Sequence, residues 1–429
     1  MADDAALKTR PTRRRTVLRT LGLGLITGAA DDDCSAIGTF AQAGAQFGYK
    51  ILWTAPVTLP MMIAVVYLSG KLGQVTGLGL FSVLRAHSPG WLLYMVLAGV
   101  IVGNVIEAGA DIGGIAAAIG LLLHVPQWLI ILGVTLVALV MQIWGSYILI
   151  RNVLRVLAMS LLAYVISACM ARPNLAELVR GTFIPTIQFN RDFLAILVAI
   201  IGTSLSAYIY TWQSNEEVEE KIAAGRHTLR ERSGTTEPEL KRSLWDVVFG
   251  MLFSNLIMFF TMLATAATLY AAGHHTIESA ADAAQSLRPV AGNFAGLLFS
   301  LGIIGVGFLA VPVMTTGAAY DLCQSGGWRS GLSYRPNEAK VFYAAITLFT
   351  LIAMGLNFLG INPMRALVLA GIVQGFSTPL LMLLIMLMTN RPSIMGDKVN
   401  GRVINLLGWI TTALIFAASI GLIWSYLHH

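Results

Sequence analysis

Charged residues are scarce in this chain. Asp, Glu, Lys and Arg make up only 12% of the 429 residues, whereas 56% are hydrophobic, and the mean hydropathy is +0.73. Soluble domains carry about 25% charged residues. The composition therefore excludes an ordinary soluble protein and indicates an all-α integral membrane protein with many spans.

Cysteines and catalytic motifs are also few. The three cysteines, Cys34, Cys169 and Cys323, have neither disulfide nor metal-ligand spacing. The sequence contains no GxSxG, HExxH or GxxxxGK[ST] motif. We therefore expect no enzymatic activity and no bound cofactor.

Apolar runs recur along the chain. A helix needs about 20 apolar residues to cross about 30 Å of hydrocarbon. This criterion predicts about eleven transmembrane helices: 17–47 (broken near 31–36), 51–69, 91–120, 127–147, 152–170, 193–213, 245–271, 290–320, 340–360, 364–389 and 404–426.

The distribution of basic residues predicts the orientation. The N-terminal segment 1–16 and the even-numbered connections are richer in Lys and Arg than the odd-numbered ones. The positive-inside rule then places the N-terminus in the cytoplasm, and an odd number of spans places the C-terminus outside the cell. The net charge of +6 thus reflects topology and does not indicate nucleic-acid binding. The largest hydrophilic insert, 214–244, is expected in the cytoplasm, with 216–220 as a solvated helix that continues the sixth span.

A run of acids interrupts the first span. Asp31-Asp32-Asp33-Cys34-Ser35 lies between two apolar stretches, and one carboxylate near the bilayer centre costs about 2.5–3.5 kcal/mol on insertion scales. A helix that breaks here lets the acids line a water-filled cavity and frees carbonyl oxygens as ligands. The run therefore predicts a cation site.

Two segments carry a family resemblance. Asp33-Cys34-Ser35-Ala36, followed by QAGAQFGY at 42–49, resembles the first span of the natural resistance-associated macrophage protein (NRAMP) superfamily. The segment 201–208, followed by Trp212-Gln213 and the acids at 216–220, resembles the sixth span of the NRAMP-related magnesium transporter branch. The likeness extends from about residue 16 to 426.

The resemblance implies a LeuT-like architecture. Spans 1–5 (17–170) and spans 6–10 (193–389) would form two inverted five-helix repeats, followed by helix 11 with the C-terminus (404–429). Helices 1 and 6 would both be broken, with a metal site between their unwound parts.

The resemblance also implies the ligands. The family's metal-binding aspartate aligns with Asp33, and its asparagine partner with Ala36. The sixth-span methionine and histidine of the transition-metal transporters align with Ser206 and Tyr208. The implied metal site therefore consists of Asp33, Ser206, Tyr208 and backbone carbonyls near Ala36 and Thr203.

The implied substrate follows from the ligand chemistry. Ser206 stands where the transition-metal transporters have a methionine thioether, so this chain lacks that soft ligand. Oxygen ligands and water suit hard Mg²⁺ or Mn²⁺. We therefore expect a plasma-membrane importer of hydrated Mg²⁺, and secondarily Mn²⁺, that works by alternating access without proton coupling. The expected partners are divalent ions and the lipid bilayer, with no nucleic acid and no obligate protein partner.

Other polar residues within the predicted spans are candidates for the cation path or for a proton-linked role. They are Asp31, Asp32, Glu107, Asp111 and Gln374. Glu107 and Asp111 are four residues apart and share a helix face. They could be a purely structural pair, share a proton, or restore a coupling route.

Two other functions remain open. One is proton-coupled transport of Mn²⁺ or Fe²⁺. The other is transport of an amino acid or another organic solute on the same scaffold, which the acids at the first-helix break disfavour because they repel a substrate carboxylate.

Overall fold

The computed structural model describes residues 27–28, 30–144, 162–332 and 334–428. These residues form helices and connections, with no β-strand among them. The predicted N-terminal segment 1–16 and the start of the fifth span lie outside the described residues.

Among the described residues, eight helical segments are long and apolar enough to cross a membrane. Each overlaps one predicted span: Thr54–Thr76 (α4), Gly90–Gly120 (α6), Gln127–Trp144 (α7), Arg191–Ala223 (α11 and α12), Glu237–Tyr270 (α14 and η3), Arg288–Gly326 (with α17), Pro363–Thr389 (α19) and Arg402–Ser425 (within α21, Arg402–His428). The all-helical membrane class is thus confirmed.

The other three predicted spans are shorter in the described part of the chain. The first is interrupted, and its second half is α3, Cys34–Phe47. The fifth is represented by α9, Leu162–Met170, and the ninth by α18, Lys340–Leu356. The count of eleven therefore stays a prediction.

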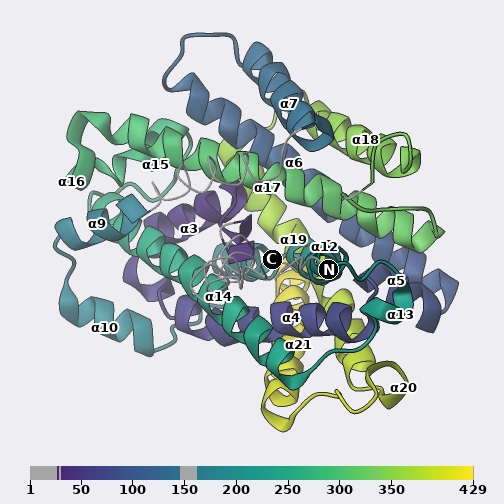
Figure 1. Cartoon of the computed structure of the whole chain (residues 1–429). Helices are drawn as coiled ribbons and strands as arrows, with labels where there is room; N and C mark the ends of the chain where they lie inside the picture. The colour runs from purple at the N-terminus through teal and green to yellow at the C-terminus, as the bar shows by residue number, and fades with distance from the viewer. Residues whose placement is uncertain (1–26, 29, 145–161, 333, 429) are drawn as a thin grey trace, which may run out of the picture.

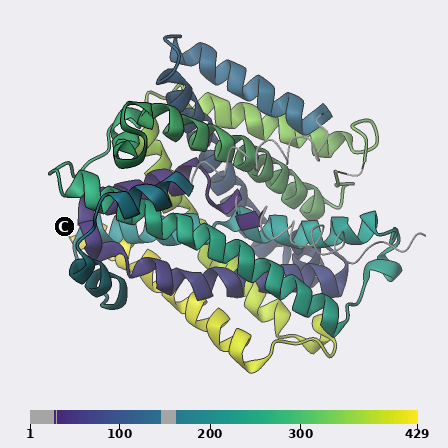
Figure 2. The same cartoon turned by 60° about the vertical axis from the view of Figure 1, so that its left-hand side comes forward.

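The long helices lie side by side, as Figure 2 shows, with α7 along one edge of the bundle and the yellow α21 along the other. The short α3 lies inside this bundle (Figure 1) and contacts α6, α11, α14 and α19. Helix α6 also packs along α17 and α19, and α12 packs along α4. The start of the short helix α3 therefore lies in the middle of the bundle.

Two interruptions in the bundle lie where the sequence predicts them. In the first span, the helix that includes Asp31 ends there, and α3 starts at Cys34 with Asp33 as its N-cap. In the sixth span, α11 (Arg191–Ser204) ends before Leu205, and α12 (Ala207–Ala223) follows Ser206. Each interruption leaves N–H and C=O groups without helical partners in the bundle interior.

The expectation of a solvated helix at 216–220 is wrong for its first residues. Helix α12 continues to Ala223, and Glu216 and Glu217 are only 8% and 6% exposed. Glu217 accepts hydrogen bonds from Gln74, Gln213 and Ser243. Gln74 and Ser243 belong to the neighbouring helices α4 and α14, so the charge pattern of α12 alone did not reveal the burial.

Glycine allows α11 and α19 to meet closely beside the second interruption. A Cβ atom at Gly202 would lie 1.9 Å from the carbonyl oxygen of Gly371 and 2.5 Å from the nitrogen of Gly375. Both contacts are with backbone atoms, which cannot move aside like a flexible side chain. The position of the α11 end therefore depends on the missing side chain.

We expect Gly202→Ala to lower the free energy of unfolding by about 1–3 kcal/mol, the usual cost of overpacking. Gly99→Ala is the matched control, because nothing lies within 4 Å of a Cβ atom there, and alanine favours a helix interior by about 1 kcal/mol over glycine. Thermal unfolding of both variants in detergent measures the difference. Equal melting temperatures would show that the α11–α19 contact tolerates a methyl group.

Candidate cation site

Asp33 is the N-cap of α3, and its carboxylate is fully buried. Its Oδ1 atom accepts hydrogen bonds from the backbone N–H of Ala36 at 2.6 Å and from the hydroxyl of Ser35 at 2.8 Å. Asp and Ser are typical residues at a helix start because their oxygens accept from free N–H groups. The acid predicted as the charged ligand is therefore also part of the helix start.

Tyr208 links the two interruptions. Its hydroxyl lies 3.0 Å from Asp33 Oδ2 and 2.7 Å from the carbonyl oxygen of Ala30. Because a phenol has one proton, it donates to only one of these oxygens at a time. Ala30 thus places a carbonyl oxygen beside Asp33, whereas Ala36 presents its N–H there from the first turn of α3.

Glu107 in α6 contacts both interruptions. Its Oε1 atom lies 3.0 Å from the hydroxyl of Ser35 and 3.3 Å from that of Ser206. Its Oε2 atom accepts a hydrogen bond from the amide of Gln374 at 2.7 Å. The amide of Gln374 also lies 3.1 Å from Asn104 Oδ1. The structure thus joins three predicted residues in one network: Glu107 of α6, Ser206 at the second interruption and Gln374 of α19.

Asp111 lies one helical turn from Glu107 and contacts the same part of α3. Its Oδ1 atom accepts a hydrogen bond from the backbone N–H of Ser35 at 3.0 Å, and its Oδ2 atom is buried without a partner. Both acids of α6 therefore point to Ser35, which also contacts Asp33.

Asp31 and Asp32 turn toward α14. Asp31 Oδ2 and Asp32 Oδ1 lie 2.8 Å and 3.0 Å from the hydroxyl of Ser254. The second oxygen of each carboxylate is buried without a partner. These two acids therefore form a separate group on the α14 side of the first interruption.

The remaining predicted ligand, Thr203, lies in the last turn of α11. Its carbonyl oxygen is 3.1 Å from the hydroxyl of Ser206, which is also 2.9 Å from the carbonyl oxygen of Gly202. The last carbonyls of a helix have no partner within that helix. Thr203 therefore presents a backbone oxygen next to the side chain of Ser206.

The site has more hydrogen-bond acceptors than protons. Each of the hydroxyls of Ser35, Ser206, Tyr208 and Ser254 has one proton but at least two acceptor oxygens within 3.3 Å. Around them lie five acids, each at most 2% exposed: Asp31, Asp32, Asp33, Glu107 and Asp111. No Lys, Arg or His of the described residues forms an ion pair with any of the five. Buried charge without a partner is strongly unfavourable, so this region is suited to a cation.

Carboxylates alone do not complete a metal site. Within the described part of the chain, no three His, Cys, Asp or Glu side chains converge closely enough to hold a metal ion. A cation here must therefore combine one or two carboxylates with hydroxyls, backbone carbonyls and water. This donor set contains only hard oxygen ligands, which suit Mg²⁺ and Mn²⁺.

Sequence reasoning missed Ser35 and Ser254 as site residues. Ser35 lies in the motif at the first interruption, but the motif alone assigns it no role, although serine side chains commonly form hydrogen bonds at helix starts. Nothing in the sequence around Ser254 indicates its role, because Asp31 is 223 positions away.

Cys34 has a packing role at this interruption. Its buried thiol donates a hydrogen bond to the carbonyl oxygen of Ile303 at 3.4 Å. A Cβ atom at Gly307 would lie 2.7 Å from the Cys34 sulfur. The thiol therefore contacts α17.

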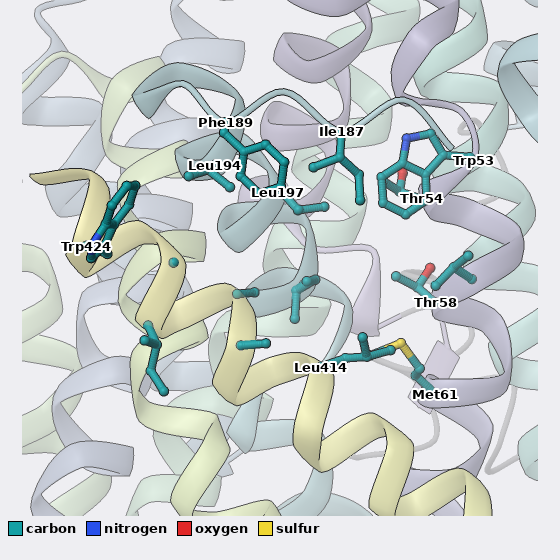
Figure 3. Close-up of a pocket in the computed structure, with 16 residues that line it drawn as sticks. Trp53, Thr54, Thr58, Met61, Ile187, Phe189, Leu194, Leu197, Leu414 and Trp424 are labelled. Atoms are coloured by element: carbon teal, nitrogen blue, oxygen red, sulfur yellow. The ribbon is translucent and has the colours of Figure 1, made fainter. Parts of the chain in front are cut away.

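A large cavity lies elsewhere in the bundle. It has a volume of about 850 Å³ and is bordered by α4, α11, α21 and the segment before α11. Figure 3 shows Trp53, Phe189 and Trp424 around it, with mainly apolar side chains between them. None of the predicted site residues lines this cavity, and its lining contains no acid. It is therefore not the cation site.

The fold and the site together define an all-helical, multi-spanning membrane protein with two interrupted helices around buried acids. Residues 24–425 match the model of the family described as natural resistance-associated macrophage protein-like (Nramp). The chain belongs to this family.

Similar proteins agree with this assignment. The divalent metal cation transporter MntH of Klebsiella pneumoniae strain 342 is 26% identical over 408 residues, which cover 94% of this chain and 93% of the relative. A crystal structure of the Eremococcus coleocola manganese transporter aligns with a TM-score of 0.74 at 15% identity, over 99% of this chain and 88% of that one. An inward-facing structure of Mhp1 aligns with a TM-score of 0.52 at 14% identity, over 94% and 90%. These structures support the LeuT-like fold.

The two roles of Asp33 can be separated by substitution. Asn also serves as an N-cap, whereas replacing a capping residue by Ala costs about 0.5–2 kcal/mol. In the absence of divalent ions we expect Asp33→Asn to unfold at or above the wild-type temperature, and Asp33→Ala below Asp33→Asn. Thermal unfolding in detergent with chelator measures this order. The reverse order would show that the cap does not stabilise α3.

Proposed function

We propose that this protein transports divalent metal cations across the membrane, with hydrated Mg²⁺ as the first substrate and Mn²⁺ as the second. One observation carries the proposal: two interrupted helices bring buried acids and surplus acceptor oxygens together in the bundle interior, with no ion-pair partner among the described residues. Interrupted helices at the bilayer midplane are the usual ion sites of such transporters. The name of the Klebsiella relative, a divalent metal cation transporter, supports the same class.

The proposed ligands are those nearest the two interruptions. Asp33 supplies the charge, while Ser206, Tyr208 and carbonyl oxygens near Ala30 and Thr203 contribute directly or through water. Asp31, Asp32 and Gln374 would line the path or hold the ligands in place. The Ala36 carbonyl that the family alignment implies is a weaker candidate than that of Ala30, because Ala36 faces Asp33 with its N–H.

The preference for Mg²⁺ follows from the absence of a soft ligand. The position that corresponds to the family's methionine is Ser206, and the site has only oxygen donors. Mg²⁺ gives up water reluctantly and is bound through one or two carboxylates with several waters retained. The names of these relatives specify divalent metals and manganese, so the magnesium preference rests on the ligands of this chain.

The transport would be driven by the membrane potential. An interior-negative potential favours entry of a divalent cation by about 4.6 kcal/mol per 100 mV, twice the value for one charge. By the family resemblance, three titratable residues of the proton route in the metal transporters align with Asp111, Gly114 and Tyr208, so this chain keeps the aspartate and lacks the glutamate and the histidine. We therefore propose uptake without proton coupling, in the plasma membrane, with the N-terminus in the cytoplasm and the C-terminus outside.

Flux in proteoliposomes tests this proposal. With an interior-negative potential and no pH gradient, we expect uptake of Mg²⁺ and Mn²⁺, no acidification of the lumen, and loss of uptake in Asp33→Asn. Excess Mg²⁺ should compete with Mn²⁺. Absence of divalent flux in the wild-type protein would refute the proposal.

The second candidate is proton-coupled Mn²⁺ or Fe²⁺ transport, which the manganese transporter among the structural neighbours favours. It predicts that metal uptake acidifies the lumen and that excess Mg²⁺ does not compete. Transport of an organic solute would instead appear as solute uptake that is insensitive to Asp33→Asn.

Ser206 should determine the preference between hard and softer metals. We expect Ser206→Met to lower the KM for Mn²⁺ relative to that for Mg²⁺ by about tenfold, equivalent to about 1.4 kcal/mol, because a thioether favours the softer ion. Ser393→Met is the control, since this serine is exposed in the short helix Pro392–Met395. Competition assays between the two ions measure the ratio. An unchanged ratio would show that Ser206 does not contact the ion.

A further inference from the structure

Glu107 is a buried acid in the middle of α6, on a helix that is not interrupted. The ligand set implied by the family resemblance does not include it. Yet Glu107 Oε1 lies within hydrogen-bond distance of a serine at each of the two interruptions, Ser35 and Ser206. Its carboxylate therefore occupies the place where the two broken helices meet.

Glu107 and Asp33 compete for the one hydrogen bond that the hydroxyl of Ser35 can donate. The hydroxyl of Ser35 lies 2.8 Å from Asp33 Oδ1 and 3.0 Å from Glu107 Oε1, but it can donate to only one of them. The other nearby hydroxyl, that of Ser206, lies closer to two backbone carbonyls than to Glu107. Two buried carboxylate oxygens thus approach the hydroxyl of Ser35, which can donate a hydrogen bond to only one of them.

Asp111 shows independently that acceptor oxygens are in excess here. Its side chain is fully buried and is directed at the backbone N–H of Ser35, yet its Oδ2 atom has no partner. None of the three acids around Ser35 forms an ion pair within the described part of the chain. Like charges in a medium of low polarity raise one another's energy unless protons or a cation compensate them.

Gln374 fixes the orientation of the Glu107 carboxylate. Its amide donates to Oε2 at 2.7 Å and approaches Asn104 Oδ1 at 3.1 Å. One oxygen of Glu107 is thereby held by α19, and the other is directed at the interruptions. Gln374 is in this sense a positioning residue.

We propose that Glu107 is a second carboxylate ligand, so that the transported cation is bound between Asp33 and Glu107. This inference rests on the proposed function. The hydroxyls of Ser35 and Ser206 turn their lone pairs to the ion, and retained water completes its coordination. With Asp31, Asp32 and Asp111 protonated, the carboxylates of Asp33 and Glu107 together neutralise a divalent cation, whereas Asp33 alone would leave one positive charge.

The chemical class of the ligand follows from this arrangement. An ion bound by two carboxylates, hydroxyls and water is hard and doubly charged, and Mg²⁺ with its usual one or two carboxylates fits this description. A monovalent cation would leave a net negative charge in the site. The second carboxylate therefore selects divalent over monovalent ions, and the oxygen ligands determine which divalent ions bind.

Binding to the full-length protein in detergent tests the role of Glu107. Glu107→Gln preserves the size of the side chain and removes its charge, and we expect the Kd for Mg²⁺ to rise at least about tenfold, equivalent to about 1.4 kcal/mol. Glu107→Asp keeps the charge on a shorter side chain, and its Kd should lie between the two. Glu177→Gln, an exposed residue in the first turn of Leu175–Phe183, should bind like the wild-type protein. Isothermal titration with MgCl₂ and with MnCl₂ gives the Kd values.

A second measurement separates ligand binding from folding. We expect Glu107→Gln to melt at or above the wild-type temperature with chelator, but to gain less stability from added Mg²⁺. A wild-type Kd in both Glu107 variants, while Asp33→Asn loses binding, would overturn this inference and leave the proposed function intact. Absence of divalent binding and flux in the wild-type protein would refute the proposed function itself.

Discussion

The structure depends on one constraint: acids buried in an apolar bundle need compensating protons, donors or cations. The protein supplies some donors through the backbone N–H groups at the start of α3 and through four hydroxyls. These donors are fewer than the acceptor oxygens around them. This shortage of donors accounts for three features of the structure. Both helices are interrupted, three acids converge on Ser35, and Tyr208 links the first and sixth spans.

Small residues allow the helices to carry these groups close together. Gly202 brings the end of α11 against α19, the helix that holds Gln374. Gly28 lies where an added Cβ atom would be 2.2 Å from the carbonyl oxygen of Gly250 in α14, the helix that holds Ser254. In both cases close backbone contact brings a polar side chain to an interruption.

Much of this arrangement could be predicted from the sequence. The run of acids in an apolar span predicts the break at Asp32 and Asp33, because an unbroken helix would expose them to hydrocarbon. The four-residue spacing of Glu107 and Asp111 predicts that they share a face, and both indeed contact Ser35. The role of Ser254 and the burial of Glu217 could not be predicted, because both depend on partners from distant parts of the chain. The apolar cavity beside α21 likewise depends on how three separate helices pack.

The double use of Asp33 Oδ1 has a mechanical consequence. This oxygen holds the first turn of α3 through the N–H of Ala36, and the same oxygen faces Glu107 across the hydroxyl of Ser35. An ion that draws Oδ1 toward itself weakens the hold on the turn, and departure of the ion restores it. Under the proposed function, ion occupancy and the winding of the first turn of α3 would therefore be thermodynamically linked.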